Sequence, residues 1–201
     1  VRRMLRQTQG VVEMPCGSGK TETGLEAVAR IGQPALWLTH TLDLLNQSLA
    51  RAQSRLGLTD GQWGVIGDGQ ATLGTHITFA TVQTLAQRDL SGIVKRFGTV
   101  IVDECGMVGT SSLDALVTLA EQNRWRLVLV GDPRQLHAVG RGGLFDELCR
   151  TQPVHQLATI HRFSNTWEQT ASLSLRTGST SAIDAYFDHD RVQAGSFVSH
   201  Q

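Results

Sequence analysis

The sequence has few cysteines, no long apolar run and no excess of either charge. Its cysteines, Cys16, Cys105 and Cys149, are widely spaced and match no disulfide or zinc pattern. This distribution is typical of a reducing compartment, so we expect a cytoplasmic protein. No run of about 18 apolar residues occurs and no signal peptide is recognisable, which argues against a membrane protein.

The charge balance excludes a uniformly basic surface. Lys and Arg together number 18, as do Asp and Glu, so the formal net charge is zero. A general coat for nucleic acid is therefore absent, although a local basic groove remains compatible with this balance. With 201 residues, of which 40% are hydrophobic and 18% charged, the chain is long and apolar enough for one globular domain with a sizeable core.

Short apolar runs alternate with longer amphipathic segments along most of the chain. This alternation predicts an α/β fold with a mainly parallel sheet flanked by helices. After about residue 164 the composition shifts to Ser, Thr and Asp, which indicates a separate, incomplete region. The strands are expected at 10–14, 35–39, 64–66, 77–80, 99–103, 126–130 and 154–158. The helices are expected at 20–31, 42–56, 111–123 and 167–176.

A glycine-rich loop, MPCGSGKTE, follows the first expected strand at 14–22. It matches the phosphate-loop pattern G-x-x-x-x-G-K-[ST], except that Met14 replaces the first glycine. Lys20 is predicted to reach the β- and γ-phosphates of a nucleotide, and the Thr21 hydroxyl to ligate Mg²⁺. An ordinary glycine-rich turn is the alternative. The residues expected to bind the nucleotide are Pro15, Cys16, Gly17, Ser18, Gly19, Lys20 and Thr21.

Two carboxylates end the apolar strand VIVDE at 100–104. Asp103 is predicted to bind Mg²⁺, and Glu104 to orient and deprotonate the attacking water. Parallel strands present their carboxyl ends at one edge of a sheet, so the pair is expected close to the phosphate loop. Two solvated acids at the end of a strand are the alternative interpretation.

A polar loop, GDPRQLHAVGRGG, follows the next strand at 131–143. Gln135 is the candidate sensor of the γ-phosphate, because an amide both donates and accepts hydrogen bonds. An ordinary glycine-rich connection is the alternative interpretation of this loop.

Residues 10–105 resemble the first motor domain of superfamily 2 helicases of the DEAD/DEAH-like kind. The matching pieces, in order, are MPCGSGKT, LWLTHTLDLLNQS, ITFATVQTLAQ and VIVDEC. In that family the second and third pieces contact the nucleic-acid backbone. The family pattern has His where this chain has Gly106, and its Ser-Ala-Thr motif is absent here. The polar residues at the positions that the resemblance assigns to strand contact are Thr39, Thr41, Thr81 and Gln83.

Residues 103–191 resemble superfamily 1 instead, in particular the helicase part of conjugative relaxase-helicases. The matching pieces are DECGMVGTSSLDALVTLAE, VLVGDPRQLHAVGRGGLFDEL and IHRFSNTWEQTASLSLRTG. The resemblance implies that Gln135 couples the γ-phosphate to strand binding and that Arg162 is an arginine finger. The two resemblances meet at the acidic pair. Composite ancestry, recombination, a chimera or a sequence-assembly error would each produce this pattern.

Both resemblances imply a RecA-like P-loop NTPase domain that binds ATP and Mg²⁺ and hydrolyses ATP. We therefore expect a RecA-like helicase domain at 1–163 and a partial C-terminal extension at 164–201. The expected partners are single-stranded DNA, with RNA as an option, and a second RecA-like domain that this chain lacks. Two other functions stay open: a nucleotide-binding module without turnover, and a small-molecule kinase, which the two strand-contact pieces disfavour.

Overall fold

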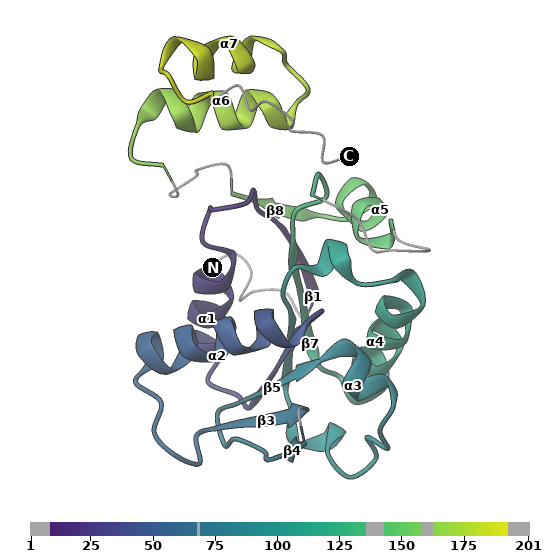
Figure 1. Ribbon diagram of the computed structural model, residues 1–201. Helices are drawn as coiled ribbons and strands as arrows, with labels where there is room; N and C mark the ends of the chain where they lie inside the picture. Colours follow the sequence, from purple (N-terminus) through teal and green to yellow (C-terminus); the bar gives the residue numbers. More distant parts are fainter. Residues whose placement is uncertain (1–8, 68, 136–142, 158–162, 193–201) are drawn as a thin grey trace, which may run out of the picture. The chain divides into compact units, whose positions relative to one another are not determined.

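The computed structural model describes residues 9–67, 69–135, 143–157 and 163–192. The chain forms two compact units, Val1–Thr159 and Ile160–Gln201. The first is a sheet with helices on both faces and the second a pair of helices (Figure 1). The domain limits expected from the sequence, 1–163 and 164–201, stay a prediction.

The described strands form one sheet in the order β4-β3-β5-β2-β6-β7-β1-β8. Neighbouring strands are parallel, apart from the pairing of β3 with β4. The carboxyl ends of β6, β7 and β1 are therefore adjacent at one edge, next to those of β2 and β5. The strands are β1 (Gln9–Glu13), β2 (Ala35–Thr39), β3 (Trp63–Gly67), β4 (Gln70–Ala71), β5 (Ile77–Thr81), β6 (Thr99–Val102), β7 (Arg126–Gly131) and β8 (Val154–Gln156).

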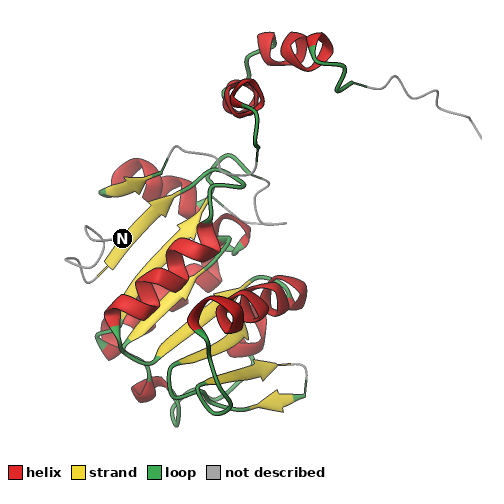
Figure 2. Ribbon diagram, turned by 90° about the vertical axis from the view of Figure 1, so that its left-hand side faces the viewer, coloured by secondary structure: helices red, strands yellow, loops and turns green. Residues whose placement is uncertain are grey.

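The helices cover the sheet in two layers, visible on either side of it in Figure 2. Along β2, Leu36 and Leu38 join the apolar core on one face, whereas Ala35 and Trp37 join that on the other. Strands buried on both faces are typical of parallel sheets. On one side lie α1 (Lys20–Ile31) and α2 (Leu42–Leu56), and on the other α3 (Val82–Ala86), α4 (Thr110–Asn123) and α5 (Leu144–Thr151).

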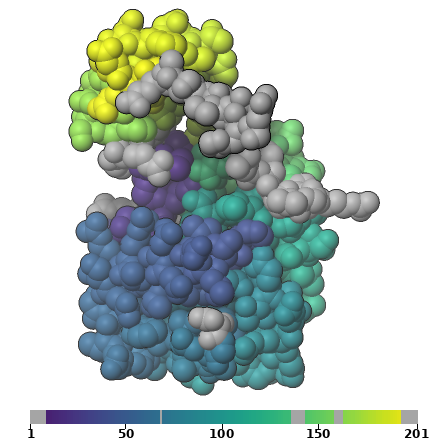
Figure 3. Space-filling view, in the orientation of Figure 1, coloured from purple at the N-terminus to yellow at the C-terminus, as the bar shows by residue number. Residues whose placement is uncertain are grey.

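Helix α1 lies close to the sheet because it carries a glycine at the point of contact. A Cβ atom on Gly24 would come within 2.6 Å of the Trp37 ring. Trp37 is fully buried and belongs to the core. Its ring centroid lies 6.2 Å from that of Phe79 on β5. The outer face of α2 lies at the surface (Figure 3). Among the described residues, no helix combines the length and apolar character needed to cross a bilayer.

Every predicted strand and helix is present, with limits that match or differ by one or two residues. The last strand ends at Gln156, whereas its expected end, Ala158, lies outside the described residues. Three short helices were not predicted: α3, α5 and α7 (Ser181–Asp188). Five to eight residues complete barely two helical turns, too few to establish a repeating apolar pattern.

The second unit pairs α6 (Thr166–Arg176) with α7. Trp167 stacks on His189, with ring centroids 3.8 Å apart, and meets the Tyr186 ring edge-on at 5.5 Å. Aromatic contacts of this kind connect the two helices, while Leu175 and Phe187 stay exposed.

Candidate active site

The phosphate loop connects the end of β1 to the start of α1. Gly17 and Gly19 have φ values of 77° and 87°, a region that favours glycine. The Ser18 hydroxyl donates to the Pro15 carbonyl at 2.6 Å, which closes the loop on itself. Cys16 is exposed at its tip. Lys20 begins α1, so the loop delivers its backbone N–H groups and this ammonium to the positive end of a helix dipole.

The surroundings of Met14 explain why it replaces the first glycine of the phosphate-loop pattern. Its side chain is fully buried in the core beneath α1, and its backbone is not in the left-handed region. Its N–H donates to the Gly131 carbonyl at 2.9 Å, which ties the phosphate loop to the end of β7. Met14 therefore fills the core at a position where the pattern has glycine. This chain does not need the conformational freedom of glycine there, because the Met14 backbone is not left-handed.

The acidic pair lies where β6 ends. Asp103 is buried and its N–H donates to the Leu38 carbonyl on β2 at 2.8 Å. Glu104 adopts a left-handed conformation, with φ 51° and ψ 44°. For a residue other than glycine this conformation costs about 1 kcal/mol or more, and such costs are typical of functional sites. The turn directs the two successive carboxylates to different partners.

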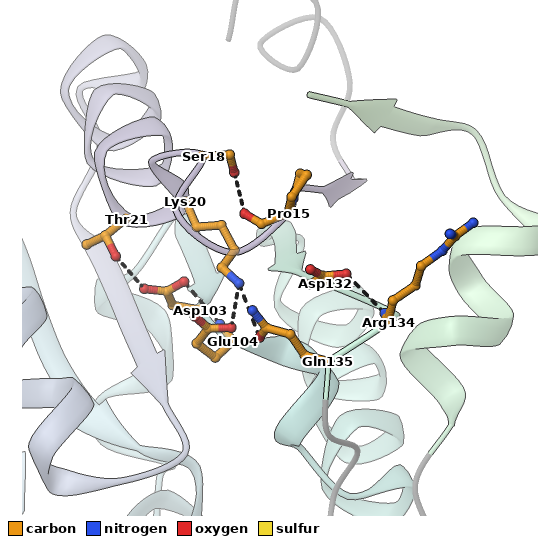
Figure 4. A network of polar contacts seen from close by, with 9 residues as sticks. All are labelled: Pro15, Ser18, Lys20, Thr21, Asp103, Glu104, Asp132, Arg134 and Gln135. Atoms are coloured by element: carbon orange, nitrogen blue, oxygen red, sulfur yellow. Dashed lines mark hydrogen bonds and ion pairs between the residues drawn. The ribbon is translucent and has the colours of Figure 1, made fainter. Parts of the chain in front are cut away.

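Lys20, Glu104 and Gln135 form one polar network (Figure 4). Lys20 Nζ lies 2.8 Å from Glu104 Oε2, with the lysine side chain only 6% exposed. In the amide orientation that suits both neighbours, Gln135 donates to Glu104 Oε2 at 3.1 Å and accepts from Lys20 Nζ at 3.2 Å. The structure thus brings together three residues that lie in separate motifs of the sequence.

Thr21 and Asp103 form the second arm of the site. The Thr21 hydroxyl donates to Asp103 Oδ2 at 3.1 Å, and the Glu104 N–H donates to Oδ1 at 3.0 Å. Burial, helped by the neighbouring Glu104 carboxylate, raises the pKa of Asp103 from 3.8 to about 6. Two oxygen ligands, one of them a buried carboxylate, match what Mg²⁺ prefers, so these residues fit the predicted metal.

Gly106 and Gly131 allow three segments to approach one another closely: the residues that follow the acidic pair, the end of β7, and α5. A Cβ atom on Gly106 would lie 3.2 Å from the Asp132 carbonyl oxygen. One on Gly131 would lie 2.8 Å from the ring of Phe145 on α5. A histidine at position 106, as in the superfamily 2 pattern, would bring its side chain too close to the Asp132 carbonyl oxygen. Gly106, where the superfamily 2 resemblance gives way to superfamily 1, therefore suits its close contact with Asp132 in the superfamily 1 segment.

The candidate strand-contact residues lie at the carboxyl ends of β2 and β5, and we call them the polar rim. Thr39 and Thr81 are buried, and their hydroxyls bind within the chain. Thr41 is exposed at the N-cap of α2. Gln83 is also exposed, with Nε2 2.9 Å from His40 Nδ1. The rim therefore presents Thr41 and Gln83 outward, whereas Thr39 and Thr81 support it from beneath.

Two residues near the site were not predicted, and one predicted residue lies outside the part of the chain that the structure describes. Asp132 is buried beside the network, after an apolar strand as Asp103 is, and that shared signal could have identified it. His40 contacts Gln83, although no sequence pattern pairs them. Arg162, the expected arginine finger, lies outside the described residues.

The family model described as "AAA domain" matches residues 1–196. A conjugal transfer protein TraA of Rhizobium radiobacter is 34% identical over 93 residues, which cover 46% of this chain and 8% of that protein. The DNA 3'-5' translocase XPB2 of Sulfurisphaera tokodaii is 27% identical over 137 residues, covering 67% and 29% respectively. The chain thus matches less than a third of either relative's length.

The crystal structure of Bacteroides Pif1 bound to single-stranded DNA has the same fold. Its TM-score is 0.62 at 16% identity, and the match covers 100% of this chain and 50% of that one. Together with the family match, this neighbour confirms the predicted α/β fold of RecA-like type. The family match and the two relatives support the predicted resemblance to helicase motor domains of superfamilies 1 and 2.

Proposed function

This chain belongs to the AAA domain family, and from that premise we propose that it couples Mg²⁺-dependent ATP hydrolysis to single-stranded nucleic acid. The expected setting is the cytoplasm, and the expected strand is DNA, with RNA as an option. Arg162 of this chain would complete the site. A second RecA-like domain, outside this chain, would complete the motor. Two similar proteins, the DNA 3'-5' translocase XPB2 and Bacteroides Pif1 bound to single-stranded DNA, favour DNA.

The observation that carries the proposal is the network of Lys20, Glu104 and Gln135 beside the phosphate loop. An ammonium, a carboxylate and an amide are three of the groups that act in γ-phosphate hydrolysis. Incoming phosphate oxygens compete with Glu104 for the Lys20 ammonium. Glu104, once released, accepts a proton from the attacking water, while the Gln135 amide orients that water or the γ-phosphate.

Thr21 and Asp103 would hold the divalent cation through their oxygen atoms. When bound, Mg²⁺ supplies charge neutralisation at the phosphate oxygens. Asp103 must be ionised to bind it, and its raised pKa of about 6 leaves it mainly ionised at neutral pH.

The polar rim is the proposed place of strand contact. Its exposed members, Thr41 and Gln83, offer neutral hydrogen-bonding groups. Such groups suit phosphate and sugar oxygens, contacts that position a strand without reading its sequence. We therefore expect binding with little preference for base sequence.

The test measures ATP hydrolysis with and without single-stranded DNA or RNA. We expect stimulation by a strand, and at least about a 100-fold loss of turnover in Glu104→Gln, which cannot take the proton. Glu121→Gln changes an exposed acid on α4 in the same way and serves as the matched control. Turnover unaffected by Glu104→Gln would contradict the assigned base.

A nucleotide-binding module without turnover is the second candidate function. It would use the same phosphate loop and differ only in leaving the bound ATP unhydrolysed. Tight ATP binding, with no hydrolysis in either the presence or the absence of a strand, would favour it.

A further inference from the structure

We propose that Asp132 is a positioning residue that sets the Gln135 amide between Lys20 and Glu104. The inference rests on the proposed function, in which Gln135 serves the γ-phosphate. Asp132 does not itself reach the reacting atoms in this proposal. It fixes the backbone of the loop from which Gln135 projects.

Asp132 acts on the loop through two acceptors. Its carboxylate Oδ1 accepts from the Arg134 N–H at 3.0 Å, and its carbonyl oxygen accepts from the Gln135 N–H at 3.2 Å. The first bond is an Asx-turn and the second closes the four-residue turn. Two successive N–H groups are thereby fixed, so the direction in which the Gln135 side chain leaves the loop is fixed as well.

The frame that carries Asp132 is itself immobilised. Asp132 is 4% exposed, and the preceding Gly131 accepts from the Met14 N–H of the phosphate loop at 2.9 Å. On its other side lies Gly106, which follows the acidic pair. A Cβ atom on Gly106 would lie only 3.2 Å from the Asp132 carbonyl oxygen. The turn is thus held against the two loops that supply Lys20 and Glu104.

This arrangement explains how a polar loop can place one amide accurately. Gln135 has several rotatable bonds, and its amide contacts two charged partners at 3.1 and 3.2 Å. Losing the Asx-turn would free the backbone at Arg134 and Gln135, and both amide contacts would lengthen together. Small displacements of a catalytic group cost up to about 100-fold in rate.

The experiment follows the side-chain amide of Gln135 by NMR in the full chain without nucleotide. The signals are identified by their loss in Gln135→Ala. We expect Asp132→Ala to move them to the position of solvent-exposed amides, whereas Asp132→Asn, which keeps an acceptor oxygen, largely preserves them. Should the Ala variant not fold, Asp132→Ser, a weaker acceptor in the same turn, is expected to give an intermediate displacement.

Asp89→Ala is the matched control, because Asp89 Oδ1 accepts from the Ser91 N–H at 2.9 Å in an exposed loop outside the network. It should leave the Gln135 signals in place. Unmoved Gln135 signals in Asp132→Ala, or in Asp132→Ser where that variant is needed, would overturn the proposal. Because this readout needs no turnover, it stays decisive even if the chain proves not to hydrolyse ATP.

Where turnover is measurable, a double-mutant cycle adds a second readout. Asp132→Ala should lower kcat about 10-fold with little change in KM, since it acts on a group used in the transition state. In a Gln135→Ala background the same change should have no further effect. Additive losses would show that Asp132 acts by another route and would overturn the proposal.

Discussion

Two neighbouring stretches of one sheet edge differ in how they treat polar groups. At the ends of β6, β7 and β1, Lys20 and Asp103 are buried charges with charged or hydrogen-bonding partners. At the ends of β2 and β5, the polar rim is neutral, and the Thr41 and Thr81 hydroxyls cap helices. The first stretch contains desolvated charges, and the second contains neutral hydroxyl and amide groups.

The difference predicts how each stretch responds to substitution. Removing one partner of a buried charge leaves the other uncompensated, which costs several kcal/mol. Removing an exposed neutral donor exposes the remaining group to water at little cost. We therefore expect large, coupled effects at the nucleotide site and small, separable effects along the rim.

The largest effect is expected for Lys20→Ala. Loss of the ammonium removes the cation for phosphate and leaves the Glu104 carboxylate without its ion-pair partner. We expect nucleotide affinity to fall at least about 100-fold, as for the loss of charged hydrogen bonds. Titration with a fluorescent ATP analogue measures it. Lys95→Ala, at an exposed position, is the control, and equal affinities in the two variants would contradict the prediction.

The second effect is a pH dependence of stability without metal. The folded protein binds the Asp103 proton more tightly than the unfolded chain does, because its pKa rises from 3.8 to about 6. The stabilisation from this group is therefore complete below pH 3.8 and is lost as the pH rises through about 6. The difference amounts to at most about 3 kcal/mol. In urea unfolding, wild type minus Asp103→Asn should show this decline, and a constant difference would refute it.

A smaller gain is expected for Glu104→Gln. The ion pair with Lys20 disappears, so phosphate no longer competes with a carboxylate for the ammonium. The Glu104 side chain is 22% exposed, and solvent screening keeps the gain modest, at about fivefold in affinity for a non-hydrolysable ATP analogue. Calorimetry measures this gain. Unchanged or weaker binding would show that the ion pair does not oppose nucleotide.

The smallest effects concern the polar rim and separate its two layers. Gln83→Ala should weaken single-stranded DNA binding a few-fold without changing stability, since Gln83 is exposed. Thr81→Val removes the α3 cap, in which the hydroxyl accepts from the Thr84 N–H at 3.2 Å, and should cost about 1 kcal/mol. Fluorescence anisotropy and thermal unfolding measure the two effects. A reversed pattern would contradict the division into exposed and supporting residues.

Local patterns made much of the architecture predictable. The strands are apolar runs of suitable length, and α1 and α2 carry apolar residues at helical spacing, so their limits matched closely. The short helices α3 and α5 escaped prediction because five and eight residues are too few to establish a repeating apolar pattern. The two-residue strand β4, which pairs antiparallel with β3, was not predicted either, because two residues carry no recognisable pattern.

The sequence by itself determined the chemical parts of the site: a phosphate loop, two carboxylates at a strand end and an amide in a polar loop. These are local patterns, fixed by neighbouring residues. Only the tertiary structure decided that Lys20 pairs with Glu104, that Thr39 and Thr81 are buried, and that Gly106 meets the Asp132 carbonyl. Such contacts join residues far apart in the chain, and strand order and close packing set them rather than any spacing along it.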